Sequence, residues 1–223
     1  MNTLTVLDVT SSRNSEALAA TPIVFVADAD VAVRESLERL IEASGWQAET
    51  CASAREFLAS PRATVPSCLV LDVALPDLDG LDLQRRVAAE RPAVPIIFLA
   101  GHADVVTSVK AMKAGALEFL TKPCSREVLL AAIRQALDHS RRRLERDAMT
   151  KTLRENYASL TRREREVMTL VASGLLNKQI GGELGISEIT VKAHRGQVMR
   201  KMHADSLPAL VTMAARLADH RPS

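Results

Sequence analysis

Hydrophobic positions between residues 22 and 137 follow two alternating periods. Short, largely apolar runs predict buried strands at residues 23–27, 68–72, 95–100 and 116–120, and residues 47–51 are a further strand candidate. Between them, apolar residues recur every three or four positions, which predicts amphipathic helices at residues 31–44, 54–58, 81–89, 105–114 and 127–137. Five strand–helix units in succession predict an α/β fold, a doubly wound parallel five-stranded sheet with helices on both faces.

The last third of the chain has helix signals and no strand signals. Thr161 is followed three residues later by Glu164, the spacing of a capping box at a helix start. Asn177 is predicted to cap a second helix, and Ser187 a third that spans Glu188–Met202. With a fourth helix near residues 207–217, residues 159–223 are predicted to form a separate four-helix, all-α domain.

Residues 138–158 join the two predicted domains and are highly charged, without glycine or proline. Leu137 and Leu144 are one heptad apart, but Lys151 stands where a third apolar member would be. This pattern predicts a solvent-exposed helical linker with modest pairing potential.

The ends and the hydropathy of the chain bound its class. Residues 1–21 lack the basic start and apolar block of a signal peptide and are interpreted as a flexible tail before a first domain at 22–137. No stretch approaches the ~20 apolar residues that a membrane span needs. We therefore expect a cytoplasmic protein without a membrane partner.

The charge is distributed unevenly along the chain. Residues 1–137 carry 13 Lys and Arg against 17 Asp and Glu, whereas residues 158–223 carry 10 against 6. A basic C-terminal domain behind an acidic N-terminal one suggests a polyanionic partner for the former.

The three cysteines show no zinc-ligand spacing and no disulfide framework. Reduced thiols in a cytosolic protein are one interpretation. A redox switch at Cys124, which follows a Lys-Pro pair, is the other.

Charged residues stand where the predicted strands end. Asp28 and Asp30 follow the first strand, Asp72 ends the third, and Lys122 follows the fifth. In a parallel sheet the carboxyl ends share one edge, where ligands and chemistry are found. Ordinary loop capping is the alternative role for Asp28 and Asp30.

Two helices joined by a short turn that contains Gly185 form a helix-turn-helix unit. Its second helix can enter the major groove of duplex DNA. The polar residues of that helix that we expect to be exposed are Lys192, His194, Arg195, Gln197, Arg200 and Lys201. Thr190, near the helix start, is placed to meet a phosphate.

Four stretches of this domain resemble the LuxR-type helix-turn-helix. They are LTRREREV at 160–167, NKQI at 177–180, ISEITVKAH at 186–194 and RKM at 200–202. With the upstream domain, the chain resembles the FixJ/NarL class of response regulators over residues 22–218. The resemblance implies binding to double-stranded DNA as a homodimer, with RNA polymerase as a further partner. It also implies DNA contacts by Thr190, Lys192, His194 and Arg195, with Asn177 and Lys178 near phosphates.

The first domain resembles a receiver of the flavodoxin-like fold. In receivers an aspartate after the third strand accepts a phosphoryl group from a sensor histidine kinase, aided by Mg²⁺ and a lysine. By this resemblance Asp72 is the phosphoacceptor, Lys122 the lysine and Asp28 the first acidic position. Phe119 matches the switch aromatic, and a cis Lys122-Pro123 bond is implied.

Two positions depart from the receiver pattern. Ala29 stands where the family has a second Asp that ligates Mg²⁺, and Ala100 where it has Thr or Ser. An alanine methyl neither ligates a cation nor donates a hydrogen bond. We therefore expect a degenerate receiver, in which a Mg²⁺ site at Asp28 and Asp72 is weak or absent. No other cofactor is expected. The competing hypotheses are that Asp30 replaces the missing ligand, or that Asp28 and Asp72 suffice and phosphorylation is normal.

Three classes of function are compared. A sequence-specific DNA-binding transcription regulator accounts for both domains. Phosphatase-like enzyme chemistry by Asp28, Asp72 and Lys122 has little support, since the chain lacks a glycine-rich phosphate loop. A protein-interaction adaptor with a vestigial DNA domain remains the alternative, which a salt-dependent gel shift would separate from the first.

Overall fold

The computed structural model of the chain describes residues 20–101 and 105–219. They form two compact units whose border falls between Arg146 and Asp147. The predicted N-terminal tail, residues 1–21, lies outside the described residues except for its last two positions.

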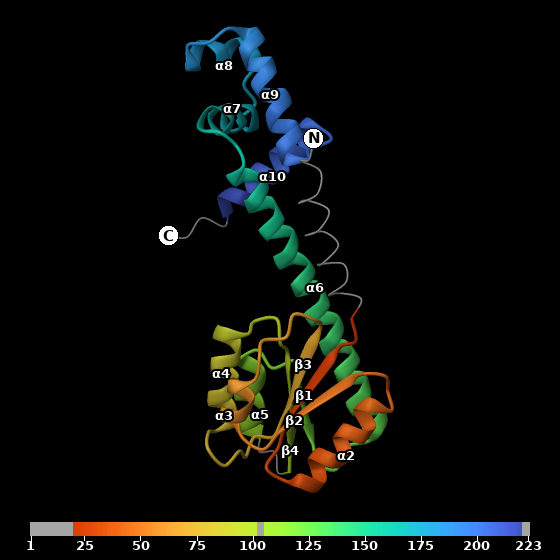
Figure 1. Ribbon diagram of the computed structural model, residues 1–223. Helices are drawn as coiled ribbons and strands as arrows, with labels where there is room; N and C mark the ends of the chain where they lie inside the picture. The colour runs from red at the N-terminus through yellow and green to blue at the C-terminus, as the bar shows by residue number, and fades with distance from the viewer. Residues whose placement is uncertain (1–19, 102–104, 220–223) are drawn as a thin grey trace. The chain divides into compact units, whose positions relative to one another are not determined.

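The first unit is built on a five-stranded sheet (Figure 1). Its strands are β1 (Ile23–Ala27), β2 (Gln47–Cys51), β3 (Ser67–Leu71), β4 (Ile96–Ala100) and β5 (Glu118–Thr121). All neighbouring strands pair in parallel, in the order β2-β1-β3-β4-β5. This is the doubly wound, flavodoxin-like order, so the predicted fold class is confirmed.

The fifth strand begins two residues later than predicted. Gly115 adopts φ +92°, and the N–H of Ala116 still donates to Ala111 O in the preceding helix. Ala116 therefore belongs to the end of the preceding helix. Its apolar side chain is buried there without taking part in strand pairing.

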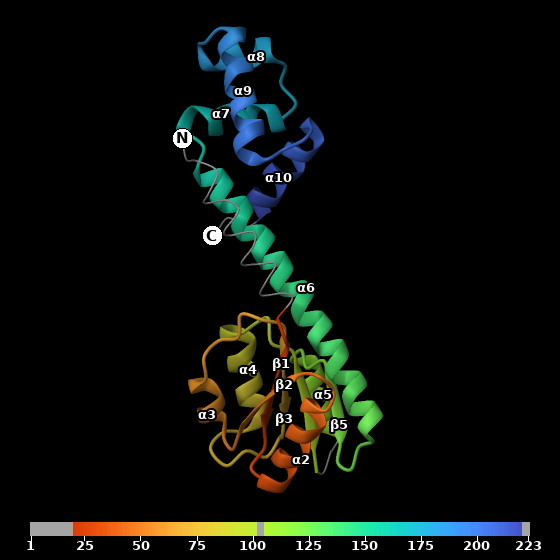
Figure 2. The same cartoon turned by 45° about the vertical axis from the view of Figure 1, so that its right-hand side comes forward.

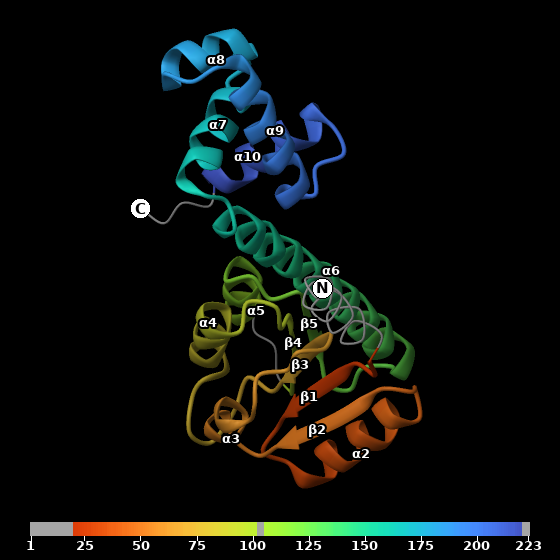
Figure 3. The same ribbon diagram turned by 45° about the horizontal axis from the view of Figure 1, so that its top comes forward.

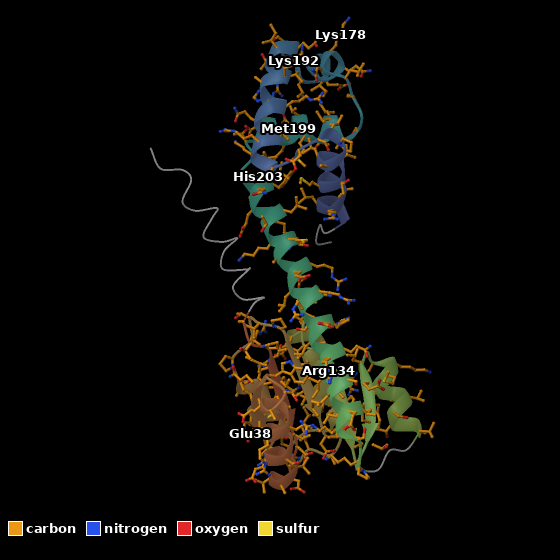
Figure 4. The ribbon with its side chains drawn as sticks, turned by 90° about the vertical axis from the view of Figure 1, so that its right-hand side faces the viewer. Glu38, Arg134, Lys178, Lys192, Met199 and His203 are labelled. Atoms are coloured by element: carbon orange, nitrogen blue, oxygen red, sulfur yellow. The ribbon has the colours of Figure 1, made fainter. Side chains whose placement is uncertain are left out.

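Helices cover both faces of the sheet (Figures 1 and 3). They are α2 (Val31–Glu42), α3 (Ala54–Ala59), α4 (Gly80–Glu90), α5 (Val105–Lys113) and α6 (Arg126–Ala158). α2 and α6 form one layer, marked in Figure 4 by Glu38 and Arg134, and α3, α4 and α5 form the other.

Side chains alternate between these layers along each central strand. Val24 and Val26 pack with α2 and α6, whereas Phe25 and Ala27 pack with the opposite layer. Because both faces are buried, the strand sequences are continuously apolar instead of alternating with polar residues. A fully buried side chain of this size contributes about 1.5–3 kcal/mol to folding, which makes these layers the main source of the unit's stability.

α6 runs without a break from Arg126 to Ala158, so the helix predicted for residues 138–158 is its second half. Ser140 on this helix is fully buried. Its hydroxyl donates to Ala93 O at 2.6 Å and accepts from the Ser67 N–H at 3.1 Å. These two bonds fasten α6 to the edge of the sheet where β3 begins.

The second unit is entirely helical over its described residues (Figure 2). After the end of α6 it contains α7 (Arg162–Ala172), α8 (Asn177–Leu184), α9 (Glu188–Met202) and α10 (Leu207–Asp219). Its core joins Val167, Ile180, Val191 and Met202, which come from three of these helices. The predicted capping box is confirmed, since Thr161 and Glu164 each bond the other's backbone N–H.

The turn between α8 and α9 depends on two glycines. Gly185 ends α8 in the left-handed region, with φ +64°. A Cβ at Gly181 would lie 2.8 Å from Ile186 O, which real Cβ atoms essentially never show. Only glycine at position 181 lets the chain after the turn pack this closely against α8.

One predicted cap is wrong. Asn177 is the first residue of α8 and does not cap it; Leu176 holds the cap position, and its N–H donates to Gln179 Oε1 at 2.8 Å. The predicted cap at Ser187 is confirmed, because its hydroxyl accepts from the Thr190 N–H.

Within residues 20–101 and 105–219, no helix is long and apolar enough to cross a membrane.

Candidate functional site

The sheet brings three chemistry-bearing residues to one edge. Each follows its strand directly and continues its backbone ladder: Asp28 N–H donates to Cys51 O, Asp72 N–H to Ala27 O and Lys122 N–H to Ala100 O. These bonds fix the backbone from which the three side chains extend. Residues up to 94 positions apart in the sequence are thereby placed within bonding distance.

The Lys122 ammonium bridges the two carboxylates. Its Nζ lies 2.6 Å from Asp28 Oδ2 and 3.2 Å from Asp72 Oδ2. Asp28 is only 3% exposed. Burial alone would lower the pKa of Lys122, but its hydrogen bond to Asp28 and the attraction of both carboxylates outweigh that effect and raise it. The bridging group is therefore a permanent cation.

The other carboxylate oxygens accept backbone hydrogen bonds. Asp28 Oδ1 accepts from the Asp30 N–H at 2.9 Å, and Asp72 Oδ1 from the Ala74 N–H at 3.3 Å. Asp30 Oδ1 accepts from the N–H groups of the first turn of α2. The alternative role of Asp30 as an N-cap is therefore confirmed, and its carboxylate is engaged at the helix start.

Ala29 and Ala100 lie at the strand ends that the resemblance to receivers implies. Ala29 is exposed in the loop after β1, and Ala100 is buried at the end of β4. Neither offers an oxygen atom from its side chain. Among the described residues no cluster of three His, Cys, Asp or Glu side chains could hold a metal ion. A donor set of two carboxylates that already share an ammonium does not fit a firmly held Mg²⁺ ion.

Phe119 on β5 is turned toward the core. Its ring stacks on Phe98 with 5.7 Å between centroids and packs against the buried cluster under α3, α4 and α5. The implied cis bond between Lys122 and Pro123 is confirmed. Cys124 is half-buried, and burial raises the pKa of its thiol, which is the opposite of what a reactive thiolate needs.

In the second unit, Asn177 and Arg195 bond each other. Arg195 Nη1 donates to Asn177 Oδ1 at 2.6 Å and so ties α9 to the start of α8. Thr190 and His194 are half-buried, and the Thr190 hydroxyl lies 2.8 Å from that of Ser187. Of the six predicted DNA contacts, these four lie beside or within the packed part of the unit.

The other two predicted contacts are exposed lysines. Lys178 extends from α8 and Lys192 from α9, both at the end of the unit away from α10 (Figure 4). Lys192 lies 3.6 Å from Glu188 one turn earlier, an exposed pair of small energetic value. Both ammonium groups are available to a polyanion.

Comparison with known proteins agrees with this arrangement. Residues 24–134 match the model of the response regulator receiver domain, and residues 158–214 that of the bacterial regulatory proteins of the luxR family. Nodulation protein W of Bradyrhizobium diazoefficiens is 46% identical over 87% of this chain and 86% of its own length. The chain belongs to the response regulators with a LuxR-type DNA-binding domain.

Two other relatives and one solved structure are also similar to this chain. The response regulator protein TodT of Pseudomonas putida is 43% identical over 88% of this chain and 87% of its own. The transcriptional regulatory protein FixJ of Bradyrhizobium diazoefficiens is 38% identical over 86% and 94%. The solved structure of the response regulator StyR matches with a TM-score of 0.80 and 43% identity, covering 88% of this chain and all of that one. These relatives are named as regulators, not enzymes.

One exposed face of α9 in this response regulator carries three residues that the sequence did not predict to be exposed. Ile189, Ala193 and Gly196 are exposed there, in line with Lys192 and Arg200. Their spacing of three and four residues places them on the helix side opposite the buried Val191 and Val198. The helical period of the buried positions could have identified this face, whereas a search for polar residues could not.

Lys201 of the response regulator has a structural role. Its Nζ lies 2.7 Å from Glu164 Oε2 and links α9 to the capping box of α7. Desolvation raises the pKa of the Glu164 carboxyl, but the hydrogen bonds from Lys201 and from Thr161 outweigh it and lower the pKa. The expectation that Lys201 lies on the exposed face is therefore wrong.

Proposed function

We propose that this response regulator is a cytoplasmic, sequence-specific DNA-binding transcription regulator whose receiver acts without phosphorylation. It is not an enzyme. The observation that carries the receiver part of the proposal is the ammonium of Lys122 held between Asp28 and Asp72, next to alanines at positions 29 and 100.

Electrostatics at Asp72 disfavour phosphoryl transfer. Two carboxylates and one ammonium leave a net charge of −1 before any phosphoryl donor arrives. Receivers offset the incoming charge with Mg²⁺, and here one of its carboxylate ligands is replaced by Ala29. Without a divalent cation, a phosphoryl group at Asp72 would face the neighbouring Asp28 at close range in a largely buried site.

The response to a phosphoryl group is missing as well. A phosphate at Asp72 would find no hydroxyl at position 100 to bind, because the Ala100 side chain has no donor. Phe119 already packs against Phe98 and the core without a phosphoryl group at Asp72. Control therefore passes to dimerisation, a ligand or a partner protein.

The conventional alternative is phosphorylation of Asp72 by a sensor histidine kinase. The convergence of Asp28, Asp72 and Lys122 supports it, since these are the receiver positions that this chain retains. The experiment that follows separates the two proposals.

Incubation of the full-length protein with Mg²⁺ and acetyl phosphate is expected to give no phosphoryl adduct by intact mass. The double variant Ala29→Asp, Ala100→Thr restores the missing carboxylate and hydroxyl and is expected to gain one phosphoryl group. Adding Asp72→Asn to that variant removes the nucleophile and serves as the control. Rapid, stable phosphorylation of the unaltered protein would mean that the receiver is conventional.

Dimerisation is proposed to occur through α5. Four of its apolar side chains are exposed along one side: Val105 (77%), Val106 (61%), Val109 (44%) and Met112 (44%). Such an apolar stripe on a soluble unit indicates an interaction surface. We assign a second copy of the chain to this surface, because two-fold symmetric operators are bound by dimers.

Val109→Asp is expected to convert a dimer to a monomer in sedimentation velocity, because it would place an unpaired charge in the interface. Val31→Asp, at an exposed valine on α2, is the matched control and should leave the dimer intact. Equal sedimentation of both variants and the unaltered protein would rule out this face.

DNA binding is expected to respond differently to the two exposed lysines. Lys178→Ala, at a phosphate-contact position, should weaken binding uniformly across sequences and reduce the salt slope by about 1. Lys192→Ala should instead cost about 1–3 kcal/mol on the preferred sequence and reduce its preference over random duplex. Lys151→Ala, at an exposed lysine of α6, is the control.

Gel shifts over a range of salt concentrations provide these values. Absence of any shift of duplex DNA, even at low salt, would favour the adaptor alternative, in which the DNA domain is vestigial. Contact with RNA polymerase belongs to the same proposed function and is assigned to no residue.

A further inference from the structure

Gly196 lies in the interior of α9 without a reason in the fold. Its backbone is helical with negative φ, and a Cβ built there meets no atom within 4 Å. Gly181 and Gly185, by contrast, are required by close packing and by a positive φ. Glycine is the poorest helix former after proline, because it has the most backbone freedom to lose. The helix is therefore weakened at a position where alanine would fit.

The position of Gly196 on the helix indicates what it serves. It follows Lys192 by four residues and precedes Arg200 by four, so it lies between two cations on the exposed face. Seven residues before it is Ile189, which at 80% has the largest exposed fraction among the exposed large hydrophobic side chains of the described residues. Ala193 lies between them and is also exposed. Ile189, Ala193 and Gly196 thus form an apolar strip with charged side chains beside it, and two of its three residues have a small side chain or none.

The major groove offers a matching surface. It is about 12 Å wide, and a helix with its side chains is about 10–12 Å across, so side-chain size limits how deeply a helix enters. The C5-methyl of thymine is the apolar group that base edges present in this groove. A β-branched side chain and a helix backbone without a Cβ would make close van der Waals contact with it.

We propose that Gly196 and Ile189 determine sequence specificity: Gly196 lets the α9 backbone approach the base edges, and Ile189 contacts thymine methyl groups. This inference rests on the proposed DNA-binding function and identifies which bases its surface selects. The flanking Lys192 and Arg200 add charge beside the strip, and the strip adds a preference for thymine to the preference that Lys192 provides.

The test begins with a duplex selected from a randomised pool by the unaltered full-length protein. Gly196→Ala should raise the melting temperature by a few degrees, on the order of 4 °C, because alanine favours the helix. In fluorescence anisotropy it should nevertheless bind the selected duplex about tenfold more weakly, with affinity for random duplex nearly unchanged. Gly182→Ala, at an exposed helical glycine of α8 with open space around its Cβ, should gain stability without losing the preference.

Replacing thymine by uracil in the selected duplex removes the methyl groups alone. The unaltered protein should lose about fivefold or more in affinity, and Ile189→Ala should bind the thymine and uracil duplexes equally. Unchanged binding of the selected duplex by Gly196→Ala, or indifference of the unaltered protein to uracil, would overturn the inference while leaving DNA binding intact. Failure of the unaltered protein to select any duplex would instead overturn the proposed function.

Discussion

The ammonium of Lys122 between the carboxylates of Asp28 and Asp72 is the contact on which the first unit's function depends. Parallel strands in the order β2-β1-β3-β4-β5 bring these three residues to one edge. Two carboxylates that share one ammonium would repel each other without it, so Lys122 stabilises their close approach. With Ala29 in place of a carboxylate, we propose that this site is short of a ligand for Mg²⁺.

In the second unit, some basic side chains pair within the fold and others are exposed. Lys201 and Arg195 are tied to Glu164 and Asn177 and hold the helices together. The exposed Lys178 and Lys192 remain for a polyanion. A count of basic residues on α9 would therefore overstate the number of cations free to contact DNA. We propose that the apolar strip of Ile189, Ala193 and Gly196 adds to recognition beside them.

Much of the architecture could be predicted from the sequence because it rests on local patterns. The strand Ile23–Ala27 and the caps at Thr161 and Ser187 are as predicted, since apolar runs and hydroxyl–backbone bonds act over a few residues. The convergence of Asp28, Asp72 and Lys122 followed from the parallel topology alone.

The remaining features depend on contacts between distant segments. Asn177 has a good capping side chain, but Arg195, 18 residues away, engages its oxygen while Gln179 bonds the Leu176 N–H. The burial of Ser140 within a charged stretch depends on Ser67 and Ala93. The half-buried positions of Thr190 and His194 on α9 likewise depend on which residues the other helices cover.

The central claim is that Lys122 takes the place that a divalent cation would share with Asp28 and Asp72. Nuclear magnetic resonance of the Lys122 side-chain ammonium, assigned with Lys122→Arg, measures this directly during titration with Mg²⁺. The account predicts an ammonium signal that stays unchanged into the millimolar range of Mg²⁺. A saturable shift of that signal at lower Mg²⁺ concentrations would show that the cation enters the site and would contradict the account.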